Sequence, residues 1–356
     1  MTQNRKSKKL WKWAWGDANI IFVGLSLMQA LNLINTIEQF SKGATTLLKV
    51  ILDSLVLLSV IGAFIFFFQR IRKLAKQLET KQLPVCFVVN KTPGEAQQNF
   101  EKLKSAITEL TGFSAFDKIE GFSTRFGCLI PQERNYLQPE VPQWKGYIND
   151  AIESIKSFAS SIMENKVYHI ALDVPATMAL GIGAVFSTKH PLVVYQWDGK
   201  QYLPVLNLMQ DPRMVKEHLP EGYQYRYFRI TYPEKYKAEV AVVLGAASHE
   251  AVNDVKKYLE TRKMDMSLVV AENTYAGNLT ETEWLQAIRE LFSLFTHLAK
   301  TQTVSEYHVF YSIPVALGFG LGMALGQFKP VTLYNWEKDQ ATYYPVLKLN
   351  ELGVTY

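Results

Sequence analysis

A duplicated block of sequence limits what this chain can fold into more than any other feature. Tyr168-His-Ile-Ala-Leu-Asp-Val-Pro175 corresponds to Tyr307-His-Val-Phe-Tyr-Ser-Ile-Pro314, 139 residues later. Further matches follow in the same order: Pro191 and Pro330, Tyr195-x-Trp197-Asp198 and Tyr334-x-Trp336-Glu337, and Tyr202-x-Pro204-Val-Leu and Tyr344-Pro345-Val-Leu. A repeat of this length predicts one structural unit built twice, with a pseudo-symmetric seam between the copies. We expect the function to lie at this seam.

Both copies alternate apolar strands with amphipathic helices. In the first copy we expect strands at Leu83–Val89, Gly127–Ile130, Val167–Val174 and Leu192–Tyr195, and helices ending near Leu110 and spanning Trp144–Met163 and Pro175–Phe186. The second copy repeats this order, with strands at Glu239–Leu244 and Met266–Val270 and helices ending near Leu259 and spanning Trp284–Ala299, before the duplicated block. Because the strands are continuous apolar runs, they predict an α/β fold of two tandem Rossmann-like units with mainly parallel sheets.

Residues 1–80 have the pattern of a two-helix membrane hairpin. Two apolar runs, 18–34 and 50–68, would each cover about 26–28 Å as helices, close to the ~30 Å hydrocarbon core of a bilayer. Basic residues flank both outer ends, which predicts cytoplasmic N- and C-termini. A buried hairpin in a soluble protein is the alternative, while the second apolar run disfavours a cleavable signal peptide. We therefore expect a membrane protein with two spanning helices and a cytoplasmic body.

The charge of the chain supports the same division. The segment up to residue 81 carries twelve Lys/Arg and four Asp/Glu, a net of +8, so the remaining residues sum to −3. A slightly acidic body argues against binding of bulk DNA or RNA. Cys86 and Cys128 lie in apolar stretches and are expected to be buried free thiols. The six histidines form no His-x-x-x-His pair, and we expect no metal site.

Two features imitate catalytic or cofactor motifs. Gly318-Phe-Gly-Leu-Gly322 resembles a dinucleotide fingerprint, but Pro314 already starts the helix, so the glycines fall inside it. We expect them to allow close packing of the helix on the sheet. His169 and His308 lie within predicted strands without a nucleophile–base set, which favours a structural role. The Tyr-x-Trp-Asp/Glu motif is expected to pack its aromatic ring at a strand end, with a subunit contact as the alternative. We expect no catalytic residue and no cofactor.

The loops after the strands are the candidate ligand site. Ligands of parallel α/β sheets bind at the carboxyl ends of strands, where helix N-termini favour phosphate. The candidate residues are Asn90, Lys91, Thr92, Arg134, Pro175 and Thr177 in the first copy and Ser248, His249, Asn273, Thr274, Tyr275, Ser312 and Pro314 in the second. Ordinary turn chemistry is the alternative explanation for each of them.

The doubled block, Pro-x-x-x-Ala/Gly-Leu/Phe-Gly-x-Gly followed by Pro-x-x-x-Tyr-x-Trp-Asp/Glu and Pro-Val-Leu, resembles the SAVED domain over residues 83–349. That family is a fusion of two CARF-like units and serves as the sensor of bacterial CBASS antiphage systems. The resemblance implies a first CARF-like half at 81–212, a connector at 213–236 and a second half at 237–356, behind the hairpin of residues 1–80.

The resemblance also implies a function. A cyclic di-, tri- or tetranucleotide, made by a partner nucleotidyltransferase of the CD-NTase type, would bind the cytosolic domain and drive homo-oligomerisation, often head to tail in this family. Clustered hairpins would then disrupt the inner membrane and cause abortive infection, without enzymatic activity. The alternative is a membrane-tethered ring nuclease, although Val174-Pro-Ala-Thr177 lacks the lysine of the Gly-Gly-Thr-Lys-like turn of CARF proteins. A scaffold with a vestigial pocket is the third possibility.

Overall fold

A computed structural model describes most of the chain after residue 80. The described residues are 80–115, 129–132, 141–220, 222–247, 251–275, 279–301, 304–327, 330–353 and 356, together with 65 and 69. The chain divides into two compact units, Met1–Thr80 and Lys81–Tyr356. Apart from Ile65, the expected membrane spans lie outside the described residues, as does Cys128. Within the described residues, no helix has both the length and the apolar character needed to cross a bilayer.

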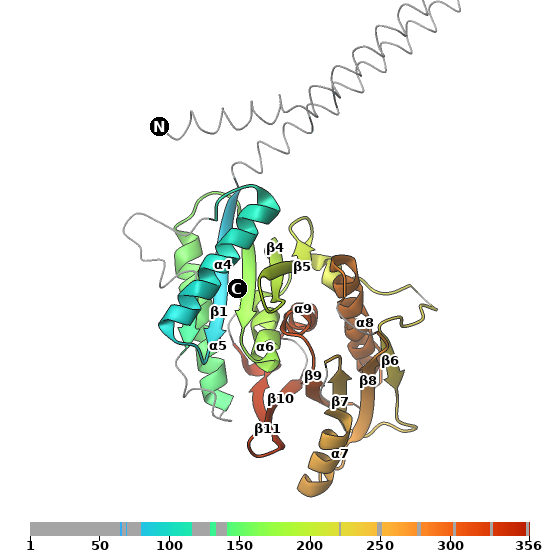
Figure 1. Cartoon of the computed structure of the whole chain (residues 1–356). Coiled ribbons are helices and arrows are strands. Elements are labelled where there is room, and N and C mark those ends of the chain that lie inside the picture. The colour runs from blue at the N-terminus through green and yellow to red at the C-terminus, as the bar shows by residue number, and fades with distance from the viewer. Residues whose placement is uncertain are drawn as a thin grey trace, which may run out of the picture. The chain divides into compact units, whose positions relative to one another are not determined.

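The unit Lys81–Tyr356 contains two lobes, the first of which is built on a five-stranded sheet (Figure 1). Its strands are β1 (Lys81–Val89), β2 (Leu129–Gln132), β3 (Lys166–Asp173), β4 (Leu192–Trp197) and β5 (Tyr202–Leu208), in the spatial order β2-β1-β3-β4-β5. The helices of this lobe are α4 (Pro93–Thr111), α5 (Val141–Ser160) and α6 (Ala176–Phe186). The first four strands are parallel, and β5 runs antiparallel to β4.

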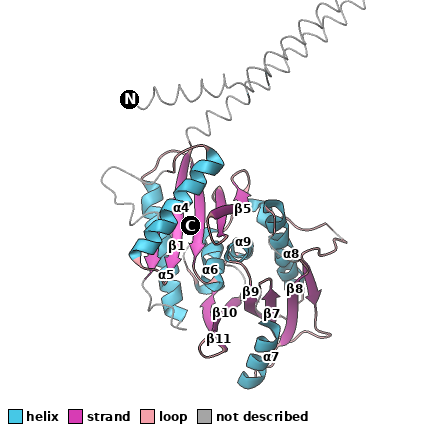
Figure 2. Ribbon diagram, viewed as in Figure 1, coloured by secondary structure: helices cyan, strands magenta, loops and turns pink. Residues whose placement is uncertain are grey.

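The second lobe repeats this arrangement with one further strand (Figure 2). Its strands are β6 (Phe228–Thr231), β7 (Glu239–Gly245), β8 (Ser267–Asn273), β9 (Glu306–Ser312), β10 (Val331–Glu337) and β11 (Thr342–Lys348), in the order β11-β10-β9-β7-β8-β6. The helices are α7 (Ala251–Arg262), α8 (Glu281–Ala299) and α9 (Val315–Leu325). Strands β10, β9, β7 and β8 are parallel, whereas β11 and β6 are antiparallel to their neighbours.

This architecture confirms the expected tandem α/β fold with mainly parallel sheets. The central strands are buried along nearly their whole length, as in β1, where Leu83 to Val89 are all buried, because helices cover both faces of a parallel sheet. The capping box of Thr92 and Glu95 starts α4, and Gly112 in the left-handed region ends it.

Strands β5, β6 and β11 were not among the elements expected from the sequence. Pro204 in β5 and Pro345 in β11 weaken the strand pattern, but both strands lie at a sheet edge, where a missing N–H costs no ladder hydrogen bond. Strand β6 arises from the expected connector, 213–236, and forms the other edge of the second sheet. Both edge hairpins share a β-bulge before the motif tyrosine, at Tyr195 and Tyr334. Trp197 faces Tyr202 and Trp336 faces Tyr343, so Tyr343 rather than Tyr344 is the counterpart of Tyr202.

Helices α6 and α9 form the central contact between the lobes (Figure 1). A Cβ added at Gly183 of α6 would lie 2.0 Å from the carbonyl oxygen of Phe319 in α9, and one at Gly322 would lie 2.0 Å from that of Leu180. Only glycine fits at such a backbone approach. The expectation of helix-on-sheet packing is therefore wrong for this pair, because the glycines bring two helices of different lobes into contact.

A buried carboxylate fixes the segment between the lobes. Glu290 in α8 is fully buried and accepts hydrogen bonds from the backbone N–H groups of residues 226, 227 and 228, at 2.8, 2.9 and 3.1 Å. The hydroxyl of Tyr223 donates a fourth, at 2.8 Å. These bonds satisfy donors at the start of β6 that α8 would otherwise bury unpaired. The connector is thus held against the second lobe.

Candidate functional site

A cavity of about 550 Å³ lies where the two lobes meet. Its walls come from the β4–β5 hairpin of the first lobe and from the segments that follow β7, β8 and β9 in the second. We call it the seam cavity; its lining residues are Gln196, Trp197, Asp198, Leu203, Val205, Ala246, Ala247, Asn273, Tyr275, Leu279, Trp284 and Pro314. It therefore combines the seam predicted from the repeat with the carboxyl ends of the second lobe's strands.

The first-lobe wall is a tight turn at the end of β4. Asp198 organises this turn, because its Oδ1 accepts hydrogen bonds from the backbone N–H groups of Lys200 and Gln201 at 2.7 and 2.8 Å. These two bonds also lower the pKa of the Asp198 carboxyl. Trp197 packs edge-on against Tyr202, with a ring-centroid distance of 5.1 Å, and Lys102 Nζ lies 4.4 Å from its ring centroid.

The second-lobe wall is held by hydrogen bonds from side chain to backbone. The amide Nδ2 of Asn273 donates to the carbonyl of Tyr275 at 2.9 Å, and the indole N–H of Trp284 donates to the carbonyl of Leu279 at 2.9 Å. A capping box between Thr280 and Glu283 fixes the start of α8, directly before Trp284. The aromatic wall of the cavity is therefore preorganised by contacts within its own lobe.

Two pseudo-equivalent hydrogen bonds link the lobes beside the seam. The Oε1 of Gln196 accepts from the backbone N–H of Ala316, in the first turn of α9, at 3.3 Å. In the other copy, the hydroxyl of Thr177 in α6 donates to Oδ1 of Asn335 at 3.0 Å. Gln196 and Asn335 occupy the variable position of the two Tyr-x-Trp motifs. This position therefore carries an inter-lobe contact in both copies.

The duplicated histidines are structural. His169 is fully buried; its Nδ1 lies 2.8 Å from the hydroxyl of Tyr195, and its Nε2 lies 2.8 Å from Oε1 of Gln82. His308 forms the equivalent contact with Tyr334 at 2.9 Å. Burial lowers the pKa of His169 to about 3, so the ring is neutral and acts as a hydrogen-bonding core residue. Cys86 is also buried, and burial raises the pKa of its thiol to about 12.

Three of the residues predicted from the sequence line the seam cavity: Asn273, Tyr275 and Pro314. Three others, Arg134, Ser248 and His249, lie outside the described residues. The remaining seven are not among the lining residues; they are Asn90, Lys91, Thr92, Pro175, Thr177, Thr274 and Ser312.

Local contacts explain several of these seven residues. Lys91 lies 3.8 Å from the carboxylate of Asp173, and Thr92 caps α4. Asn90 adopts the left-handed region with φ 59°, as expected for a tight turn. The hydroxyl of Thr274 donates to the carbonyl of Arg226, and the carbonyl of Ser312 accepts from Ala246 N–H at 2.7 Å. Asn90 and Thr92 therefore have turn and capping roles, and Lys91, Thr274 and Ser312 make contacts within their own lobe.

The cavity also contains residues that the sequence analysis did not place in a ligand site. Gln196, Trp197 and Asp198 belong to the Tyr-x-Trp-Asp motif, which was interpreted as a packing motif. Trp284 was predicted only as the first residue of the helix Trp284–Ala299. The signal for the first three was present, because they follow the expected strand Leu192–Tyr195 at its carboxyl end.

The seam cavity suits a flat, partly polar ligand. Its lining combines the aromatic rings of Trp197, Tyr275 and Trp284 with amide groups and one carboxylate, and its volume is within the usual range of small-molecule sites. Among these lining residues, Asp198 alone carries a formal charge. No group of three potential metal ligands occurs among the described residues.

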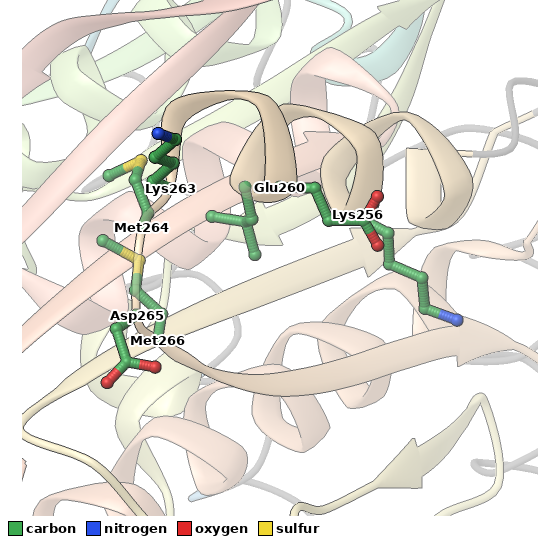
Figure 3. Close-up of a pocket in the computed structure, with 7 residues that line it drawn as sticks. Lys256, Glu260, Lys263, Met264, Asp265 and Met266 are labelled. Atoms are coloured by element: carbon green, nitrogen blue, oxygen red, sulfur yellow. The ribbon is translucent and has the colours of Figure 1, made fainter.

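A second cavity, of about 340 Å³, lies at the opposite end of β8, where α7 ends (Figure 3). Charged and sulfur-containing side chains line it, among them Lys256, Glu260, Met264 and Met266. It is remote from the carboxyl ends of the strands and receives no residue from the first lobe. The seam cavity is therefore the better candidate for a ligand site.

Comparison with known proteins gives a family for this architecture. Residues 151–349 match the family model of the SMODS-associated and fused to various effectors sensor domain, SAVED. Among solved structures, the Cap4 SAVED/CARF-domain containing receptor of Acinetobacter baumannii with the cyclic trinucleotide 3'3'3'-cAAA is similar, with 15% identity and a TM-score of 0.48 over 75% of this chain and 51% of that chain. The receptor of Moraxella osloensis has 17% identity and a TM-score of 0.42, over 73% and 61%. No curated protein matches.

Proposed function

Because this chain belongs to the SAVED family of sensor domains, we propose that its seam cavity binds a cyclic oligonucleotide and that binding activates a CBASS antiphage response. The observation that supports this function is the cavity itself, which both lobes form at the carboxyl ends of the strands. Rings of two to four nucleotides present several bases and phosphates around a closed backbone. A ligand of that shape can contact both lobes at once.

We propose that the activated sensor acts on the membrane. Residues 1–80 contain two apolar runs of membrane-spanning length with basic outer flanks. Ligand that binds one assembly state more tightly than another shifts the population toward that state by the difference in affinity. In this proposal the favoured state is a homo-oligomer whose clustered hairpins disrupt the inner membrane. The protein then acts as an effector and not as an enzyme.

The sensor half is tested by binding to the full-length protein in detergent. Cyclic di-, tri- and tetranucleotides are compared with linear oligonucleotides of the same composition by thermal shift and calorimetry. A bound ring at one hundred times its Kd adds about 2.7 kcal/mol to the free energy of unfolding, which would appear as a higher Tm. If no ring raises the Tm and none gives a binding isotherm, the sensor function is rejected.

The effector half needs a separate experiment. The full-length protein is reconstituted in liposomes that contain a self-quenched dye, and a ring that binds is added. Dye release is expected with the ring and not with its linear counterpart. Binding without release would reject the membrane effector while leaving the sensor intact. Chromatography of the same samples distinguishes the ring-nuclease alternative, because a nuclease would return linear products.

A further inference from the structure

The amino ends of the first lobe's parallel strands lie on the side of the lobe at which the chain enters from the apolar runs. Lys81 begins β1 directly after residue 80, and residues 69–80 separate it from the second apolar run, which ends at residue 68. A segment of that length spans about 18 Å as a helix and at most about 40 Å when extended. A bilayer that holds this run would therefore lie within that distance of Lys81.

The helices of the first lobe end on the same side. Each of α4, α5 and α6 follows one parallel strand and returns the chain to the start of the next. The turns after α5 and α6 are joined to the strand starts, because the carbonyl of Asn165 accepts from Lys81 N–H at 2.7 Å and that of Pro191 accepts from Tyr168 N–H at 3.0 Å. We call this side the tether face; the residues considered are Lys81, Leu110, Met163, Lys166 and Lys189.

Two large apolar side chains are exposed on the tether face. Met163, in the turn between α5 and β3, is 100% exposed, and Leu110, in the last turn of α4, is 37% exposed. Single exposed apolar residues are common on protein surfaces. These two, however, lie on the side of the lobe from which the chain leads to the apolar runs, and an apolar side chain at a bilayer surface can enter the boundary between headgroups and acyl chains.

The strand starts of the two lobes carry opposite charges. The first sheet begins with Lys81 in register with Lys166, whereas the parallel pair β7–β9 of the second begins with Glu239 in register with Glu306. Lys189 adds an exposed positive charge to the tether face, in the turn between α6 and β4. The side nearest the apolar runs is therefore the one whose strand starts are basic.

The cations of the tether face differ in how far they are already engaged. Lys81 pairs with Glu164 at 3.0 Å and has a side chain that is 27% exposed. The Nζ of Lys166 donates to two backbone carbonyls at the end of α5, at 3.0 and 2.7 Å. Glu109, in the last turn of α4, opposes part of the positive charge. Exposed Lys189 is therefore the cation best placed to meet an external anion.

We propose that the tether face rests on the anionic surface of a lipid bilayer, with Met163 at the boundary of headgroups and acyl chains and Lys189 beside lipid phosphates. This inference rests on the proposed membrane hairpin and adds the surface through which the sensor contacts the bilayer. Basic residues next to a membrane span attract anionic lipids, and the segment 69–80 adds such residues at 70, 72, 73 and 76. In this orientation the carboxyl ends of the first lobe's strands point away from the bilayer.

The test uses the full-length protein in liposomes with one fluorescent label. In a Cys128→Ser background, where Cys86 is buried, Met163→Cys carries an environment-sensitive dye. Lys300→Cys is the matched control, because Lys300 is exposed at the end of α8, before the strand start of β9 in the second lobe. Lipids brominated near the headgroup boundary quench a dye that enters the bilayer.

We expect quenching at position 163 and none at position 300 in liposomes that contain phosphatidylglycerol, with weaker quenching at 163 in phosphatidylcholine alone. Lys189→Gln should lower the ratio of quenched to unquenched dye at 163 about fivefold, which corresponds to about 1 kcal/mol for one cation near an anionic surface. Lys300→Gln should leave this ratio unchanged. Circular dichroism and Tm confirm that the variants are folded.

Flotation of the liposomes separates this inference from the proposed membrane hairpin. Protein that floats with the liposomes but is not quenched at 163, or is quenched equally at 163 and 300, overturns the contact of the tether face and leaves the hairpin in place. Equal quenching in both lipids, or a wild-type ratio in Lys189→Gln, overturns the anionic partner. Protein that does not float with the liposomes overturns both proposals.

Discussion

The two copies of the Tyr-x-Trp-Asp/Glu motif have the same local structure and different surroundings. In both, the tyrosine contacts a buried histidine, the amide at the next position links the lobes, and the tryptophan packs on a tyrosine of the edge strand. Yet the first copy, at Trp197, lines the seam cavity, whereas Trp336 packs in the cluster beneath α7. The repeat therefore fixes the local framework, and the neighbouring elements determine which copy can contact a ligand.

The largest expected effect concerns the contact between α6 and α9, to which each copy contributes one equivalent glycine. Gly183→Ala and Gly322→Ala each place a methyl group 2.0 Å from a backbone oxygen of the opposite helix. We expect each to lower the free energy of unfolding by about 3 kcal/mol or more, because backbone cannot move away as a flexible side chain can. Urea denaturation is the measurement. Gly146→Ala in α5, with open space around the position, is the control and should be neutral or slightly stabilising. Unequal losses at the two glycines would contradict the symmetry of the helix pair.

The next largest effect on stability is expected in the second copy alone, at the buried Glu290. Trp144 aligns with Trp284, so Asp150 in α5 is the counterpart of Glu290 in α8. Asp150 is exposed, whereas Glu290 accepts four hydrogen bonds. Glu290→Ala should cost about 2–3 kcal/mol, because buried backbone donors lose a charged partner, and Asp150→Ala should cost almost nothing. Equal stability of the two variants in chemical denaturation would show that the connector is not anchored by this carboxylate.

The pH dependence of stability should also differ between the copies. The folded pKa of His169 is lowered from 6.5 to about 3 by burial. Below pH 6.5 the unfolded chain takes up a proton that the folded protein does not, so stability falls as pH decreases from 6.5 toward 3, by up to about 1.4 kcal/mol per pH unit. Burial also lowers the pKa of His308, but Glu306 and Glu239 oppose this shift.

Denaturation of wild type, His169→Gln and His308→Gln at pH 7, 6 and 5 checks this difference. His169→Gln should be less stable than wild type at pH 7 but show a flatter pH dependence. His308→Gln should retain most of the wild-type slope. If His308→Gln changed the slope of stability against pH more than His169→Gln does, His169 would not be the main source of the pH dependence.

The smallest effect on stability is expected from the two hydrogen bonds between the lobes, made by Gln196 and Asn335. Gln196→Ala and Asn335→Ala each remove one hydrogen bond between lobes, and we expect each to cost about 1 kcal/mol. Only Gln196 lines the seam cavity, so only its variant should weaken the binding of a cyclic oligonucleotide, as measured by calorimetry. An equal loss of affinity in Asn335→Ala would mean that the link matters through lobe orientation and not through the cavity wall.

Much of the fold follows from the sequence, since continuous apolar strands, helix-starting prolines and the repeat predict tandem parallel α/β lobes. The antiparallel edges were not predicted, because Pro204 and Pro345 disrupt the strand pattern and only the sheet order shows that both strands lie at an edge. The partners of Gly183 and Gly322 were also missed, because spacing alone does not say whether a helix faces a sheet or another helix.

The candidate site was predicted only in part. The rule that ligands bind at the carboxyl ends of strands leads to Asn273, Tyr275 and Pro314. Asp198 also follows a parallel strand, β4, but its motif was interpreted as packing, and its turn lines the cavity only together with residues of the second lobe. Such a contact depends on how the lobes are docked, and one lobe's sequence pattern carries no information about it.

The direct backbone contact at Gly183 and Gly322 has a mechanical consequence. At Gly183 and Gly322 no side chain separates the two backbones, so rotation of the lobes at this point would bring carbonyl oxygens against α-carbons. The contact between α6 and α9 is therefore a rigid part of the molecule. Any movement of the lobes on ligand binding would therefore have to occur away from this contact, for example at the β4–β5 turn that Asp198 holds.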